Sequence, residues 1–131
     1  MKYKMYTDGG SRGNPGKAAI GVVIYNEKDK VIEKISKYIG TATNNVAEYS
    51  ALLVGVLALK KLKCTEVEMF LDSLLIVNQL NGKYRVKDSK MKKLYLKVME
   101  NLEDIDWTVA HVKRNKNKVA DSLVNDALDA L

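Results

Sequence analysis

Apolar and polar residues alternate over several short stretches of the chain, and longer stretches show the spacing of one helix face. The alternation predicts five strands, over residues 2–8, 18–25, 31–39, 66–72 and 105–112. Helical spacing and end signals predict helices over 44–62, from the cap Ser73 to about 80, over 89–102, and from 116 onward. The segment 9–16 holds four glycines and the only proline, which predicts a loop. Three successive strands, then strands alternating with helices, predict an α/β protein with helices packed on a mixed sheet.

The composition narrows the class of protein. With 47% hydrophobic and 29% charged residues, the chain is typical of a globular protein. No repeat, linker or low-complexity tract interrupts it, so we expect one domain over residues 1–131. The longest apolar run, 51–59, is too short to cross a membrane, and the first residues lack the apolar core of a secretory signal. A lone cysteine, Cys64, fits a reducing compartment, so we expect a cytoplasmic protein.

Positive charge is concentrated in one part of the sequence. The net charge is +6, and residues 83–97 hold seven basic side chains against one acid, which equals the whole excess. Such a surface would bind nucleic-acid phosphates and release counterions. The alternative is an ordinary solvated face. The residues that we expect to contact a polyanion, called the basic segment below, are Lys83, Arg85, Lys87, Lys90 and Lys93.

Four acidic residues stand where stability alone would not place them. Asp8 and Asp72 come at the ends of the first and fourth predicted strands. Glu48 lies near the start of an otherwise apolar helix, and Asp121 lies in the first turns of the last helix. If the first and fourth strands are parallel neighbours, the two aspartates end side by side at the carboxyl edge of the sheet, where α/β sheets hold ligands. Each acid alone is also explained as a turn residue or as an acid near a helix N-terminus.

Clustered carboxylates repel one another, and divalent cations relieve that repulsion. Hard oxygen ligands favour Mg²⁺ or Mn²⁺ over Zn²⁺. A pair of such ions, about 3.5–4 Å apart, clamps the attacking and leaving oxygens in phosphodiester cleavage. Together with the basic segment, the four acids therefore predict metal-assisted phosphoryl transfer to water.

Four blocks of sequence resemble the ribonuclease H type 1 family, in the family's order and spacing over essentially the whole chain. They are Tyr6–Gly16, Thr43–Glu48, Leu71–Ser73 and Val112–Leu123. The resemblance implies the ribonuclease H-like fold, a five-stranded mixed sheet with three antiparallel strands and then two parallel ones, flanked by helices. It also implies endonucleolytic cleavage of the RNA strand of RNA–DNA hybrids, which leaves 3′-hydroxyl and 5′-phosphate ends. The implied cofactor is Mg²⁺, as two ions, with Mn²⁺ as an alternative.

The same resemblance implies roles for individual residues. It assigns metal binding and catalysis to the four acids, Asp8, Glu48, Asp72 and Asp121. It implies that Asn14, Asn44 and Asn45 contact the minor groove of the hybrid. It also implies that Gly9, Gly10 and Ser11 contact the ribose hydroxyls of the RNA. A DNA phosphate would be held by Thr43, and the substrate-binding set is completed by Ser73 and Arg114. The basic segment resembles a shortened form of the protrusion with which longer members grip the DNA strand.

The chain departs from the long members of the family in ways that leave two other functions open. No histidine occurs between 113 and 119, where Arg114 instead resembles a short, archaeal-like pattern, and Leu74 stands where many relatives have glutamine. These departures leave the turnover rate open. They also motivate the alternative of a binding module with little activity, and a DNA-cutting relative of the integrase or resolvase kind is a second alternative. No heptad seam is visible, so we expect a monomer with no obligate protein partner and no membrane association.

Overall fold

The computed structural model describes residues 1–131 and contains five strands and four α-helices. The strands are β1 (Lys2–Gly13), β2 (Gly16–Tyr25), β3 (Val31–Ala42), β4 (Glu66–Leu71) and β5 (Asp106–His111). The helices are α1 (Asn44–Lys61), α2 (Leu74–Leu80), α3 (Ser89–Leu102) and α4 (Lys118–Asp129), and a single 3₁₀ turn over Arg114–Lys116 precedes α4. None of the helices combines the length and the apolar character that a membrane crossing requires.

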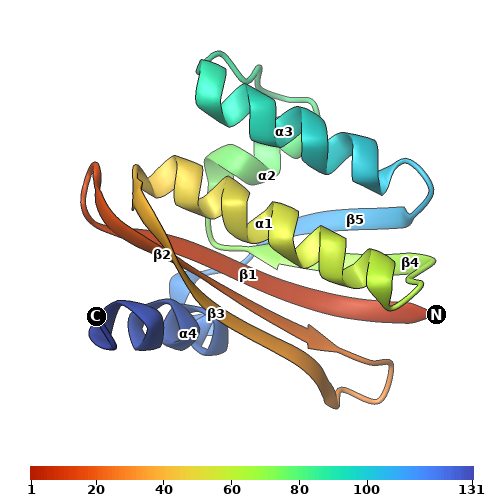
Figure 1. Ribbon diagram of the computed structural model, residues 1–131. Helices are drawn as coiled ribbons and strands as arrows, with labels where there is room; N and C mark the ends of the chain where they lie inside the picture. Colours follow the sequence, from red (N-terminus) through yellow and green to blue (C-terminus); the bar gives the residue numbers. More distant parts are fainter.

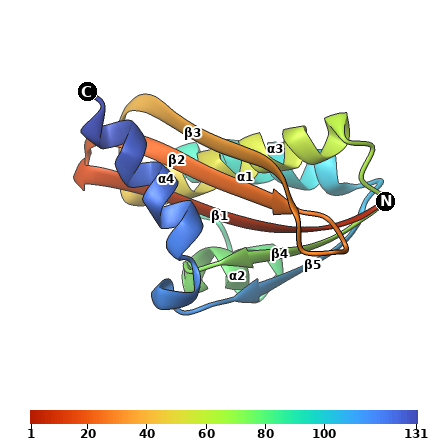
Figure 2. The ribbon, with the colours of Figure 1, turned by 90° about the horizontal axis from the view of Figure 1, so that it is seen from below.

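All five strands form one mixed sheet in the order β3-β2-β1-β4-β5. The pairs β1–β2 and β2–β3 are antiparallel, whereas β1–β4 and β4–β5 are parallel. Helices α1, α2 and α3 lie on one face of the sheet and α4 lies on the other (Figure 1). Seen from below, α4 lies across the antiparallel part of the sheet (Figure 2). The fold predicted from the sequence is confirmed, including its parallel pairing of the first and fourth strands.

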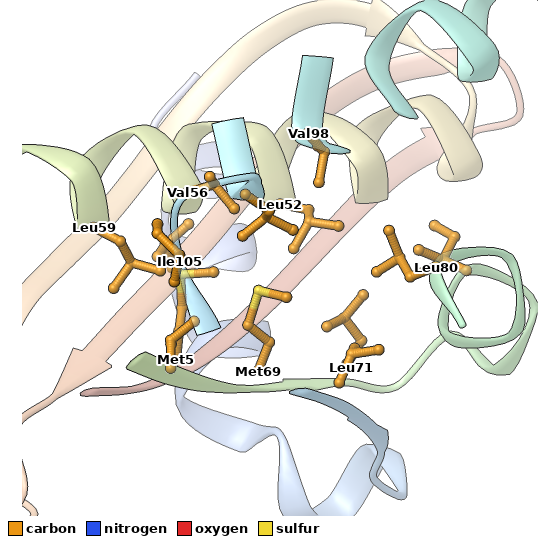
Figure 3. Close-up of a cluster of buried hydrophobic side chains, with 14 of the residues drawn as sticks. Met5, Leu52, Val56, Leu59, Met69, Leu71, Leu80, Val98 and Ile105 are labelled. Carbon is orange, nitrogen blue, oxygen red and sulfur yellow. The ribbon is translucent and has the colours of Figure 1, made fainter. Parts of the chain in front are cut away.

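The main core lies between the sheet and the helices α1, α2 and α3. Successive side chains of β1 and β4 point to opposite faces of the sheet. Met5 and Met69 point into this core, where they lie beside Leu52 and Val56 of α1 (Figure 3). Helix α1 is buried along much of its length because it packs on the sheet and under α3. A smaller cluster of Ala19, Val124 and Leu128 holds α4 on the opposite face. The helices on both faces are therefore held to the sheet by buried apolar side chains. Such burial is the main favourable contribution to folding.

The glycine-rich segment is a correction to the sequence prediction. Residues 9–13 continue β1, which turns through Asn14 and Pro15 into β2, with Gly13 paired to Gly16. The loop prediction was wrong because the local preference of glycine for turns is overridden by β2, which supplies an antiparallel partner for residues 9–13. Asp8 consequently lies inside β1 and not at its end. The parallel pairing with β4 does stop at Thr7, which pairs with Leu71, so Asp8 and Asp72 still leave that pairing together.

Two glycines let the helices approach the sheet at the level of Asp8. A Cβ atom on Gly9 would lie 2.3 Å from the carbonyl carbon of Ala47 in α1. On Gly21, which pairs with Asp8, a Cβ atom would lie 2.2 Å from the carbonyl oxygen of Ala120 in α4. Contacts this close exclude any side chain at either position. The residues that follow Ala47 and Ala120 along the chain are the acids Glu48 and Asp121.

Candidate active site

Three of the four predicted acids form a tight group. Asp8 of β1, Glu48 of α1 and Asp72, which follows β4, each offer a carboxylate oxygen, and these oxygens lie within 4.8 Å of one another. Asp8 is 7% exposed and Glu48 is 8% exposed, and Asp72 is half-buried. Three carboxylates so close to one another, two of them buried, form a site that attracts a divalent cation.

The fourth acid, Asp121, lies beside this group without belonging to it. It occupies the first turn of α4 and lines the same cleft, and its Oδ1 is 3.7 Å from Nη2 of Arg114. Its charge is one of the influences that raise the pKa of Asp8. The structure therefore brings all four acids to one place, with three at the centre and one at the side.

Burial and mutual repulsion perturb the two most buried acids. Burial raises the pKa of Asp8 from 3.8 to about 7, and the neighbouring charge of Asp72 acts in the same direction. The pKa of Glu48 lies well above its usual value, first because of burial and then because of the charges of Asp8 and Asp72. Oε2 of Glu48 is buried and has no hydrogen-bond partner. A buried polar atom without a partner is costly, and a cation at this point would satisfy it.

The acids lie in a cleft of about 550 Å³. Among the residues predicted to bind substrate, those that line the cleft are Gly9, Gly10, Ser11, Asn44, Asn45, Ser73 and Arg114. The edge formed by β1 and α1 is braced by hydrogen bonds. The Ser11 N–H donates to Oδ1 of Asn44 (2.8 Å), and the Asn44 N–H donates to Oδ1 of Asn14 (3.0 Å). This bracing fixes the β1–β2 turn against the start of α1.

Two predicted substrate contacts lie just outside the cleft lining and serve the helix that borders it. Asn14 is the acceptor just described, and the hydroxyl of Thr43 accepts from the Val46 N–H (3.2 Å) as the N-cap of α1. The hydroxyl of Ser73 caps α2 in the same way, accepting from the Ile76 N–H (3.3 Å), as the sequence predicted. All three residues therefore have structural roles beside any contact with a ligand.

The basic segment lies away from the acids, in the connection between α2 and α3 and in the first turns of α3. Its five members are all exposed: Lys83, Arg85, Lys87, Lys90 and Lys93. Arg85 also lines a second hollow, of about 420 Å³, together with Tyr84, Lys92 and Tyr95. Exposure leaves these charges free to contact phosphates.

Reasoning from the sequence missed one buried polar residue that contacts the acids. Asn117 is 1% exposed, and its Nδ2 donates to the carbonyl oxygen of Thr7 (2.9 Å) and to Oδ2 of Asp72 (3.2 Å). The only hint in the sequence is that Asn117 stands at the start of a predicted helix, and an asparagine in that position usually caps the helix. Here the side chain makes no capping hydrogen bond and points toward the acids instead.

Comparison with known proteins agrees with this geometry. A family model described as "Reverse transcriptase-like" matches residues 6–127. A protein named Ribonuclease H, from Legionella pneumophila, is 31% identical over an alignment that covers 100% of this chain and 99% of that protein. The chain belongs to the ribonuclease H family. The resemblance seen in the sequence is thus confirmed.

Other relatives place this ribonuclease H domain in proteins of different length. The "Bifunctional protein Rv2228c" of Mycobacterium tuberculosis is 40% identical over 99% of this chain, but the chain spans only 36% of that protein. The solved structure of LC11-RNase H1 in complex with an RNA/DNA hybrid matches with a TM-score of 0.93 and 42% identity, over 98% of this chain and 97% of the other. This match confirms the ribonuclease H-like fold.

Proposed function

We propose that this protein is an endoribonuclease that hydrolyses the RNA strand of RNA–DNA hybrids and leaves 3′-hydroxyl and 5′-phosphate ends. The observation that carries the proposal is the group of three carboxylate oxygens within 4.8 Å of one another, in a cleft whose edge is made of amides and hydroxyls. Membership of the ribonuclease H family supports it. The relative LC11-RNase H1, which is similar to this chain throughout, was solved with an RNA/DNA hybrid.

We further propose that the site works with two Mg²⁺ ions, which Mn²⁺ can replace. The donor set fits such ions, because it consists of hard carboxylate oxygens and includes the buried, unpartnered Oε2 of Glu48. Asp8, Glu48 and Asp72 would hold the metal, with Asp121 at the side. When bound, the metal supplies a nucleophile at neutral pH and stabilises charge on the phosphate.

The edge of the cleft is suited to recognise a hybrid without reading its sequence. Oδ1 of Asn44 accepts from the Ser11 N–H, so the amide of Asn44 presents its NH₂ group as a donor. Every base pair offers acceptors in the minor groove, so such a donor binds regardless of sequence. Gly10 and Ser11 lie beside the acids, where they can approach ribose 2′-hydroxyls, the groups that distinguish RNA from DNA.

The positive side chains would hold the phosphates on either side. Arg114 is 83% exposed at the cleft and 3.7 Å from Asp121, so it can turn toward a phosphate of the RNA strand. The basic segment lies farther away, where it would contact the DNA strand. Arg114 and the basic segment would thus each hold one of the two strands of a hybrid. Such phosphate contacts fix the position of the substrate and carry no sequence information.

A cleavage assay tests the proposal. End-labelled RNA–DNA hybrid, duplex RNA and duplex DNA are incubated in parallel with Mg²⁺ or with EDTA. We expect RNA-strand products from the hybrid in Mg²⁺ alone. The variant Asp72→Asn is expected to bind hybrid but yield no product, while the control Asp126→Asn, an exposed residue of α4 outside the cleft, cleaves normally.

Each other outcome would identify a different function. Hybrid binding without product would make the protein a binding module. Cleavage of duplex DNA in preference to the hybrid would indicate a relative of the integrase or resolvase kind. Cleavage by Asp72→Asn at the wild-type rate would show that the carboxylate group is not the catalytic centre.

A further inference from the structure

Asn117 is a cap residue whose side chain does not cap its helix. The N-caps of the other three helices, Thr43, Ser73 and Asp88, each accept a hydrogen bond from an N–H in the first helical turn. At the start of α4 no such bond exists, although asparagine is among the best capping residues. The side chain of Asn117 is used elsewhere, and at a site that is almost completely closed to solvent.

The contacts of Asn117 join three segments of the candidate active site. Its Nδ2 donates to the carbonyl oxygen of Thr7, the residue before Asp8, and to Oδ2 of Asp72. Its own carbonyl oxygen accepts from the N–H of Asp121 at 3.0 Å. A single residue is therefore linked to the β1 segment, to the end of β4 and to the start of α4.

The chemistry of these contacts requires a neutral donor. Both partners of Nδ2 are oxygen acceptors, so an aspartate at this position would place negative charge against a carbonyl and a carboxylate. Oδ1 of Asn117 is buried without a partner, which shows that the donor end of the amide determines its orientation. Buried donors to a ligating carboxylate fix its rotation, and losing them typically costs about 10–100-fold in metal affinity or activity.

We propose that Asn117 is a positioning residue for the carboxylates. It holds Asp72 in the orientation that a cation needs and fixes the start of α4, with Asp121, against β1. The proposal rests on the proposed function, since it assumes that these acids bind a divalent metal. Asn117 itself touches neither the metal nor the scissile phosphate in this role.

Calorimetry with Mn²⁺ alone tests the proposal without any substrate. The variants are Asn117→Ala, which removes both hydrogen bonds, and Asn117→Ser, whose hydroxyl is too short to reach both acceptors and which serves if the alanine variant does not fold. We expect the Kd for Mn²⁺ to rise at least 10-fold. In hybrid cleavage we expect kcat to fall by a similar factor at fixed metal concentration, while KM for the hybrid changes less than twofold.

Two controls separate positioning from general damage. Asn115→Ala alters an exposed asparagine two residues earlier and is expected to leave the Kd for Mn²⁺ unchanged. Val98→Ala creates a cavity in the core under α3, away from the cleft, and reports what a loss of stability alone does to Mn²⁺ binding. Urea unfolding of every variant places them on one stability scale.

The proposal is overturned if the Asn117 variants bind Mn²⁺ within twofold of the wild type, or if Val98→Ala weakens Mn²⁺ binding as much at equal stability. It is also overturned if KM for the hybrid rises in parallel with the fall in kcat. If the wild-type protein binds Mn²⁺ but does not cleave hybrid, the proposed function fails, and the Mn²⁺ titrations still decide the role of Asn117.

Discussion

Replacing the most central carboxylate should stabilise the metal-free protein. In the folded protein the pKa of Asp8 is about 7, against 3.8 for an ordinary aspartate. Between these two pH values the folded state keeps the proton and the unfolded chain has released it. Unfolding therefore releases a proton in this window, and a rise in pH favours the unfolded state. The variant Asp8→Asn has no proton to lose and escapes this penalty.

The magnitude follows from the pKa difference, since each pKa unit corresponds to about 1.4 kcal/mol. The advantage of Asp8→Asn over the wild type should be about 2 kcal/mol at pH 5 and about 4 kcal/mol above pH 7, where it becomes constant. Burial of Asp8, which is 7% exposed, is the main cause of this difference, and the charge of Asp72 adds to it.

Urea unfolding in EDTA at pH 5 and pH 8 measures this difference. The matched control is Asp126→Asn, which makes the same substitution at an exposed acid of α4 outside the cleft. The reasoning is refuted if Asp8→Asn is less stable than the wild type at pH 8 without metal. It is also refuted if the gap between them is the same at both pH values.

Three further predictions concern packing, charge and metal. Gly9→Ala would place a Cβ 2.3 Å from the carbonyl carbon of Ala47, so we expect a loss of about 2 kcal/mol or more in urea unfolding, together with loss of hybrid cleavage. An alanine variant with normal stability would contradict the close approach of α1. Replacing the lysines of the basic segment at 87, 90 and 93 by alanine should weaken hybrid binding and reduce the slope of log K against log salt by about 2 to 3, whereas an unchanged slope would make the segment a solvated face. Adding Mn²⁺ at 100 times its Kd should stabilise the wild type by about 3 kcal/mol and leave Asp8→Asn nearly unchanged, which unfolding at pH 8 would show.

The sequence was sufficient to predict the order of strands and helices and the grouping of the acids. Periodicity predicts the elements because buried faces must be apolar. The parallel pairing of the first and fourth strands was only a condition in the residue-based reasoning, and the structure shows it, so that Asp8 and Asp72 come together. The glycine segment was misjudged because glycine's local preference for turns is overridden by the pairing with β2. Asn117 was missed because its importance comes from Thr7 and Asp72, which lie far away along the chain. Hydrogen bonds of this kind exist only after the tertiary structure has formed.

The acids at the cleft are spread along the chain from residue 8 to residue 121, on four separate segments. Asp8 is therefore synthesised more than a hundred residues before Asp121. A growing chain that has folded its sheet and α1 still lacks α4, which must pack on β2 at Gly21 before Asn117 can reach Asp72. Until α4 has packed, Asp72 lacks the Nδ2 donor of Asn117, and Asp8 lacks the neighbouring charge of Asp121, so the complete acidic site exists only after the last helix is in place.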